Sequence, residues 1–275
     1  MRILVKVGGA QLEEAAPRTA LCNAIAHAHR EGHELIVVHG GGNQIRAVGK
    51  ALDLPDHYHE GLRITNASTA KVVLMVLGGL VNRTLVASLQ RNGVPAVGIS
   101  GADGASFTAK KLELAGVDLG FVGTIDAVRP QLVQTLLSTG YVPVIATVAP
   151  GRQASEGEPF FNLNADHAAG PLCRAFGCDA LLFLTDVPGV LDAQGQRLAQ
   201  LTPADCQALV TTGVAKGGML PKLEAALQAL RENPRALVKI APAAAPDAVL
   251  MALREGTGTR FLTAGNTTTT ESPHG

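Results

Sequence analysis

Two lysines and one aspartate are the residues of this chain best placed for chemistry on a phosphate group. Lys6 lies inside an apolar stretch at residues 3–7 and is followed at once by two glycines. Lys222 follows a second glycine pair, and Asp166 lies where a polar loop enters a helical pattern. A cation inside an apolar strand is unfavourable unless it is paired or reaches out of the core. Such a set suits direct phosphoryl transfer, in which catalysis is mainly positioning and charge stabilisation.

A glycine loop at residues 35–46 offers a place for an anion. Four apolar residues predict a short buried strand, and Gly40, Gly41 and Gly42 follow His39 directly before a helical pattern. Glycines leave backbone N–H groups uncovered, and a helix N-terminus adds unpaired donors and the positive end of its dipole. The alternative is a tight turn that needs glycine for its backbone conformation only.

The start of the chain repeats this arrangement of strand, glycines and helix. Residues 3–7 predict a strand, Gly8 and Gly9 follow, and residues 13–31 have a helical pattern. Two such units predict neighbouring parallel strands whose glycine loops open at the same edge of a sheet. Open α/β sheets bind their ligands at that edge. For Lys6 itself the alternative is a lysine on an edge strand whose ammonium group reaches solvent.

Short polar residues mark two further places where apolar elements end. Asn162, Asn164 and Asp166 alternate along a loop that enters a helix, and an Asx turn with a helix cap would also explain any one of them. Asp186 follows the apolar strand predicted at residues 180–185, and Gly189 lies in the same turn. Ordinary turn chemistry is the alternative there. The three polar residues at 162–166 together favour a site.

The segment before Lys222 predicts the first turn of a helix. Gly217, Gly218 and Met219 precede Pro221, and proline is favoured in a first helical turn. Lys222 then lies at the positive end of the helix dipole, where a cation is disfavoured by some tenths of a kcal/mol. An anionic ligand arriving there would offset this charge. The alternative is a solvated lysine that tolerates the small penalty.

Composition limits the class of protein. The 275 residues can form a large core, 47% are hydrophobic, and Lys+Arg and Asp+Glu both total 23, so nothing indicates nucleic acid or a membrane surface as a partner. The longest apolar run, residues 72–81, is too short to span a bilayer. The four cysteines form no C-x-x-C pair, which predicts reduced core residues rather than metal ligands, in a cytoplasmic protein without a signal peptide.

Strand and helix patterns alternate along nearly the whole chain, which predicts an α/β fold. A long apolar helix is expected over residues 66–91, capped by Thr65 or Asn66, and antiparallel hairpins at a sheet edge over residues 105–127. Residues 264–275 have no apolar period and predict a disordered tail. Further elements are expected as strands at 94–99, 141–148, 180–185, 236–240 and 259–262 and as helices at 43–52, 129–139, 162–176, 203–212, 219–231 and 246–254.

Six motifs in order resemble the acetylglutamate kinases, which belong to the amino acid kinase family. They are K-V-G-G at 6–9, H-G-G-G at 39–42, G-L-R-I-T at 61–65, N-L-N-A-D at 162–166, T-D-V-P-G-V-L at 185–191 and G-M-L-P-K at 218–222. The resemblance covers residues 3–262 and implies a three-layer α-β-α sandwich with a mainly parallel central sheet. It implies an N-terminal lobe (1–176) for the acyl-amino acid and for dimerisation, and a C-terminal lobe (177–263) for ATP.

The resemblance also implies a reaction and a role for each matching residue. The reaction is transfer of the γ-phosphate of ATP, with Mg2+ held mainly by the nucleotide, to the side-chain carboxylate of N-acetyl-L-glutamate in arginine biosynthesis. Lys6 and Lys222 would stabilise the transferring group and Asp166 would orient both lysines. Arg63 would hold the substrate α-carboxylate as a bidentate pair. The remaining implied site residues are Gly40, Gly41 and Asn162 for the substrate and Gly8, Gly9, Asp186, Gly189, Gly217, Gly218 and Met219 for phosphate and ATP.

Two positions depart from the family pattern without removing a group that has a role. Asn66 replaces the usual acidic residue after G-L-R-V-T, and Ala10 follows the first glycine pair. Arginine-sensitive members carry an additional N-terminal helix that joins dimers into a hexamer. Here Lys6 is only five residues from the start, so the expectation is a homodimer, joined through the helix at residues 66–91, that arginine does not inhibit.

Other functions remain open on the sequence. A kinase for N-succinylglutamate or for a carrier-bound aminoadipate derivative in lysine biosynthesis would share the fold, although G-L-R-I-T and the intact H-G-G-G favour free acetylglutamate. A non-catalytic amino-acid or nucleotide sensor is expected to lack Lys6, Lys222 or Asp166, and all three are present. A Rossmann dehydrogenase would need G-x-G-x-x-G after the first strand, where K-V-G-G-A stands instead.

Overall fold

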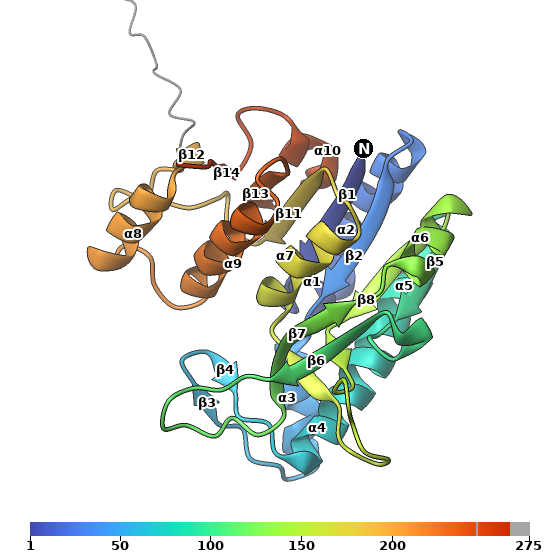
Figure 1. Cartoon of the computed structure of the whole chain (residues 1–275). Coiled ribbons are helices and arrows are strands. Elements are labelled where there is room, and N and C mark those ends of the chain that lie inside the picture. Colours follow the sequence, from blue (N-terminus) through green and yellow to red (C-terminus); the bar gives the residue numbers. More distant parts are fainter. Residues whose placement is uncertain (246, 265–275) are drawn as a thin grey trace, which may run out of the picture.

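An eight-stranded sheet runs through the centre of the molecule in the computed structural model, which describes residues 1–245 and 247–264 (Figure 1). Its strand order is β12-β14-β13-β11-β1-β2-β8-β5, and all neighbouring strands are parallel except β13 and β14. The strands are β1 (Arg2–Val7), β2 (Glu34–His39), β5 (Ala96–Ile99), β8 (Val142–Ala146), β11 (Ala180–Thr185), β12 (Gln200–Leu201), β13 (Leu237–Pro242) and β14 (Thr259–Phe261).

Helices cover both faces of this sheet, which confirms the three-layer α-β-α architecture. In β1 the side chains of Ile3, Val5 and Val7 face one apolar core, and Leu4 faces the other, as the alternation of a strand requires. Lys6 lies on the same face as Leu4, which is the face that α7 and α9 cover (Figure 1). The helices are α1 (Ala10–Glu13), α2 (Ala15–Arg30), α3 (Gly42–Ala51), α4 (Ala67–Leu74), α5 (Asn82–Arg91), α6 (Gln131–Ser138), α7 (Ala165–Ala175), α8 (Pro203–Thr211), α9 (Met219–Glu232) and α10 (Ala248–Leu253), with a short 3-10 turn η2 (Asp103–Ala105).

A second, four-stranded sheet lies beside the central one. Its order is β6-β7-β10-β9, with β6 (Phe107–Lys111), β7 (Val122–Val128), β9 (Val148–Ala149) and β10 (Phe161–Leu163). β6 and β7 pair antiparallel, as expected for residues 105–127. The hairpin lies at a sheet edge, as expected, but the sheet is the second one, because β7 pairs with β10 and β6 is its edge strand. A two-stranded hairpin, β3 (Tyr58–His59) and β4 (Leu62–Arg63), completes the strands.

The long helix expected over residues 66–91 is present and begins where the sequence indicates. Asn66 caps it, since its side chain accepts a hydrogen bond from the Thr69 N–H at 2.9 Å. Between α4 and α5 the helix widens into a π-helical segment, η1 (Met75–Val81). The run from Ala67 to Arg91 is long and apolar enough to cross a membrane by length and composition alone, and half of its most apolar window is buried inside the fold.

The two predicted lobes share one continuous sheet. Strands of residues 177–263 form one side of it and strands of residues 1–176 the other, and β1 and β11 pair at the junction. The four cysteines are free and buried, as the sequence predicts. The predicted tail at 264–275 lies, from residue 265 on, outside the described residues.

Candidate active site

Lys6, Asp166 and Lys222 form one buried cluster. The Lys6 Nζ lies 2.6 Å from Asp166 Oδ1, and the Lys222 Nζ lies 3.1 Å from Asp166 Oδ2. The Lys6 side chain is 5% exposed, the Asp166 side chain 11% and the Lys222 side chain 20%. Two ammonium groups share one carboxylate, so the cluster has one positive charge in excess. Such a charge is unfavourable away from water unless an anion offsets it.

Helix starts place the aspartate and the second lysine. The Asn164 side chain caps α7 and accepts from the backbone N–H groups of Asp166 at 2.9 Å and His167 at 3.2 Å. Asp166 is thus in the first turn, where the helix dipole favours a carboxylate. Lys222 lies in the first turn of α9, as the sequence predicts. The two helices pack closely because Gly170 has no side chain, since a Cβ there would lie 3.1 Å from Ala229 Cα.

The charges of the cluster influence one another. Burial acts to raise the pKa of the Asp166 carboxyl, but the nearby ammonium groups of Lys6 and Lys222 outweigh it and hold the pKa below its usual range. Burial lowers the pKa of Lys6, an effect that the Asp166 carboxylate opposes and the Lys222 charge increases. Asp166 is therefore ionised at neutral pH and can pair with both lysines.

The two N-terminal glycine loops meet at the same sheet edge, which confirms that prediction. A Cβ on Gly9 would lie 3.1 Å from Gly41 Cα, so the loops touch through their backbones. The Gly40 N–H continues the strand ladder and donates to the Val7 carbonyl at 3.3 Å. No acceptor for the Gly41 N–H occurs among the described residues, so this N–H is available to a ligand. Gly8 separates the strand from α1.

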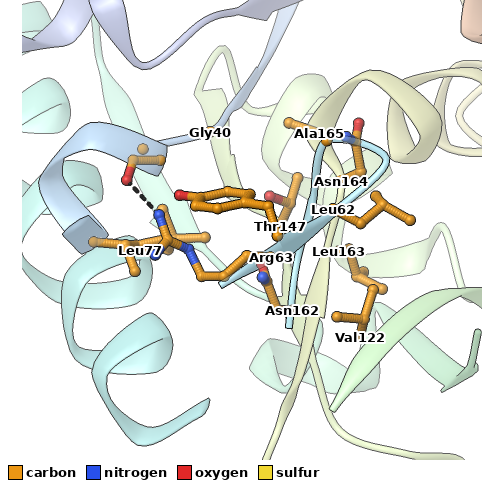
Figure 2. Close-up of a pocket in the computed structure, with 15 residues that line it drawn as sticks. Gly40, Leu62, Arg63, Leu77, Val122, Thr147, Asn162, Leu163, Asn164 and Ala165 are labelled. Carbon is orange, nitrogen blue, oxygen red and sulfur yellow. Dashed lines mark hydrogen bonds between the residues drawn. The ribbon is translucent and has the colours of Figure 1, made fainter. Parts of the chain in front are cut away.

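A pocket of about 160 Å3 opens beside the glycine loop (Figure 2). It contains the predicted substrate residues Gly40, Gly41, Arg63 and Asn162. The Ala165 that lines it is the residue directly before Asp166, so the pocket adjoins the charged cluster. Its remaining lining residues are Gly42, Ile45, Tyr58, Gly61, Leu62, Leu77, Val122, Thr147, Leu163, Asn164 and Ala165.

Arg63 is the cation of this pocket. It is 7% exposed, its Nη2 donates to the Gly42 carbonyl at 2.9 Å (the dashed line in Figure 2), and its Nη1 pairs with Asp56. The guanidinium also lies over the Tyr58 ring, 4.8 Å from the centroid. Burial would raise the pKa of Asp56, but a hydrogen bond from Arg46 and the charge of Arg63 outweigh it and lower the pKa. These contacts thus hold the guanidinium group of Arg63 in place at the pocket wall.

Two polar side chains that no sequence motif indicates also line the pocket. Thr147 directly follows β8 at the same sheet edge as the glycine loops, and that position was the signal that could have revealed it. Tyr58 lies in a polar connection with no such pattern. The predicted Asn162 lines the pocket and donates through its Nδ2 to Thr65 Oγ1 at 3.3 Å.

The residues predicted for the nucleotide lie at two other strand and helix ends. Asp186 is exposed at the end of β11 and accepts from Thr185 Oγ1 at 2.9 Å. Gly189 precedes Val190, whose N–H donates to Thr259 Oγ1 at 2.8 Å. Exposed glycines at 217 and 218 precede Met219, the first residue of α9. Within residues 1–245 and 247–264 no hydrogen bond joins Asp186 to this segment, so their common role stays a prediction.

Comparisons with known proteins agree with this architecture. The sequence model of the amino acid kinase family matches residues 1–239. The chain is 42% identical to the acetylglutamate kinase of Solibacter usitatus over 96% of this chain and 100% of that one. It is 40% identical to the acetylglutamate kinase of Geobacillus stearothermophilus over 84% and 86% of the two chains. The solved structure of smu.665 from Streptococcus mutans superposes with a TM-score of 0.80 at 25% identity, covering 95% and 98%.

Proposed function

Because the chain belongs to the amino acid kinase family, we propose that it is an acetylglutamate kinase that phosphorylates the side-chain carboxylate of N-acetyl-L-glutamate with ATP, in arginine biosynthesis. Relatives of that name match the chain over most of both lengths. In this reaction a carboxylate oxygen forms a bond to the γ-phosphorus, and the bond from that phosphorus to the bridging oxygen breaks. ADP leaves with the electron pair, and the product is the acyl phosphate.

The observation that carries this proposal is the excess positive charge of the cluster formed by Lys6, Asp166 and Lys222. During transfer the negative charge is spread over the oxygens of the phosphoryl group. Preorganised cations stabilise this charge best. Lys6 and Lys222 supply these cations, and Asp166 keeps them in place. The pocket beside the cluster would hold the acceptor.

The remaining roles are those that the family resemblance implies, and the shape of the site supports them. Arg63 binds the α-carboxylate of the acceptor through the guanidinium N–H groups that do not bond to Asp56 or Gly42. Asn162 contacts the amino-acid end of the acceptor. The loops with Gly9 and Gly41 donate N–H groups to the reacting oxygens. The nucleotide lies toward Gly8, Asp186, Gly189 and the start of α9 at residues 217–219.

The donors present at the cluster suit phosphate oxygens. Lysine ammonium groups bind phosphate as point charges. No group of three or more His, Cys, Asp or Glu side chains that could hold a metal ion occurs in the described part of the chain. Magnesium would come with the nucleotide, neutralising its phosphate charge, while Lys6 and Lys222 act on the transferring group directly.

Initial rates with three acceptors test the function. We expect ATP-dependent ADP release with N-acetylglutamate and far less with N-succinylglutamate or N-acetylaminoadipate. Arg63→Ala should raise the KM for N-acetylglutamate by about tenfold or more, because a charge-assisted bond is lost, and leave the KM for ATP unchanged. Preference for another acceptor would overturn the substrate, and a rise in the KM for ATP alone would place Arg63 at the nucleotide.

We also propose a cytoplasmic homodimer joined through the long helix. Met75 and Leu80 are 56% and 55% exposed on its outer side, and both belong to the π-helical segment. Neighbouring exposed apolar side chains favour a protein interface. The four buried free thiols suit a reducing compartment.

A further inference from the structure

His39 is a buried polar side chain that the proposed mechanism does not use. It is the last residue of β2, stands directly before the glycine loop, and is fully buried. Its ring has a partner at each nitrogen, since Nδ1 lies 3.0 Å from the Gly40 carbonyl oxygen and Nε2 lies 3.0 Å from Asn82 Nδ2. Asn82 is fully buried as well and begins α5.

Two backbone carbonyls determine which ring nitrogen carries the proton. A carbonyl oxygen can only accept, so the bond to Gly40 requires a proton on the Nδ1 of His39. The Asn82 Nδ2 also donates to the Val144 carbonyl at 2.9 Å, which identifies that atom as the amide nitrogen. The Nε2 of His39 must therefore accept from Asn82. Burial lowers the pKa of His39 to about 4, in agreement with a neutral ring.

The bond from His39 determines where the next peptide points. In a trans peptide the carbonyl and the following N–H point in opposite directions, and none of the peptide bonds described is cis. With the Gly40 oxygen held at the buried ring, the Gly41 N–H points away from the ring. Gly41 lines the acceptor pocket, and its N–H has no acceptor among the described residues.

The long helix holds Asn82 in place. In the π-helical segment hydrogen bonds span five residues, so residues five apart share a face, and both Leu77 and Asn82 are buried. A Cβ on Gly98 in β5 would lie 1.9 Å from Asn82 Oδ1, so the amide fills the space that a side chain at residue 98 would need. A flip of the amide is unfavourable, because it would place two oxygens together at Val144.

We propose that His39 and Asn82 are positioning residues that hold the Gly40–Gly41 peptide so that the Gly41 N–H donates to the acceptor substrate. Neither side chain touches the substrate, and both act through the backbone. The identity of the acceptor rests on the proposed function, whereas the hydrogen-bonded arrangement does not.

Substitution of His39 tests the effect on binding. His39→Leu should raise the KM for N-acetylglutamate about tenfold to a hundredfold, the scale of one hydrogen bond to a charged group, with the KM for ATP within about twofold. His39→Asn keeps an N–H near the Nδ1 position and should restore most of the affinity. Leu89→Ala, a buried substitution later in the same helix run, is the control for lost stability and should leave both KM values unchanged.

A spectroscopic measurement on the wild-type protein tests the arrangement without relying on activity or on a variant that folds. Two-bond 1H–15N correlation spectra of 15N-histidine-labelled protein at pH 7 should give His39 a protonated Nδ1 and an unprotonated Nε2. A proton on Nε2 would overturn the proposal, as would His39→Leu and Leu89→Ala raising the acceptor KM equally. If the wild-type protein does not phosphorylate N-acetylglutamate, the proposed function is wrong. The spectrum still decides whether His39 holds the Gly40 carbonyl through a protonated Nδ1.

Discussion

At the scale of residues, the main feature is that one carboxylate serves two lysines. Asp166 contacts Lys6 from a central strand and Lys222 from a helix, and all three side chains are mostly buried. Removing either lysine leaves the carboxylate paired with the other, so the fold keeps a compensated ion pair. Loss of a cation should therefore lower the rate of the chemical step and leave the stability of the fold largely unchanged.

Lys6→Ala and Lys222→Ala should each lower kcat by roughly 10²–10³, the effect of losing one preorganised electrostatic contact. Steady-state kinetics of each purified variant measure the loss of kcat, and thermal melting measures whether the fold keeps its stability. Lys110→Ala, which removes an exposed lysine of β6, is the matched control and should keep the wild-type kcat. A near-normal kcat in either cluster variant would make that lysine structural.

The buried neutral ring of His39 predicts a dependence of stability on pH. The pKa of His39 is lowered from 6.5 to about 4 by burial, so between these values the unfolded chain binds a proton that the folded chain does not. The free energy of unfolding then falls as pH falls from 6.5 to 4, by up to roughly 3 kcal/mol from this residue, and its contribution is complete above pH 6.5.

Urea unfolding of wild type and His39→Asn at several pH values isolates this contribution, because the other titrating groups are common to both proteins. We expect the difference in the free energy of unfolding to change between pH 6.5 and 4 and to stay constant from pH 7 to 8. A constant difference across the whole range would mean that the ring has the same pKa in the folded protein as in the unfolded chain.

At the scale of elements, the sequence predicts the features that depend on short patterns. Asn164, Asp166 and Lys222 are where the helix-start signals place them, and the loops with Gly9 and Gly41 meet because consecutive parallel strands bring them to one edge. These features follow from local chemistry and from strand direction. The pairing of Asp166 with both lysines and the place of Arg63 at the substrate come from the family resemblance instead, because no local pattern indicates them.

Other features depend on contacts between distant residues, which no local pattern reveals. The π-helical widening at Met75–Val81 lies in a stretch that is apolar all round, so its pattern does not mark which residues face the sheet. Asp56 pairs with Arg63 only because the β3–β4 hairpin folds back on itself. The place of β6 and β7 in a second sheet depends on pairing with β10, some forty residues away in sequence.

At the scale of the whole molecule, the helix run through α4, η1 and α5 faces two ways. Its inner side carries Leu77 in the pocket wall and Asn82 behind the glycine loop, and its outer side exposes Met75 and Leu80. If the outer side forms a two-fold interface, each subunit packs against the helix run of its partner. That contact stabilises the segment that supports the glycine loop within the partner. Assembly and substrate binding would then depend on the same helix.

Light scattering measures the assembly, and we expect about twice the mass of one chain for the wild-type protein. Met75→Glu combined with Leu80→Glu should give a monomer, because a closed isologous interface would contain each charge twice. Met251→Glu, at an apolar residue of α10 that is 37% exposed, should remain a dimer. A monomeric wild type, or loss of the dimer in both proteins, would contradict this interface.

The four buried thiols can report when the core of the protein becomes exposed to solvent. There is no tryptophan, but Cys22 lies in the core on one face of the sheet, whereas Cys173, Cys178 and Cys206 lie in the core on the other. Burial raises the pKa of Cys22 and of Cys206 to about 11, so native thiols react slowly with alkylating reagents. Alkylation followed by peptide mass spectrometry would therefore time the exposure of each helical layer separately, without any introduced label.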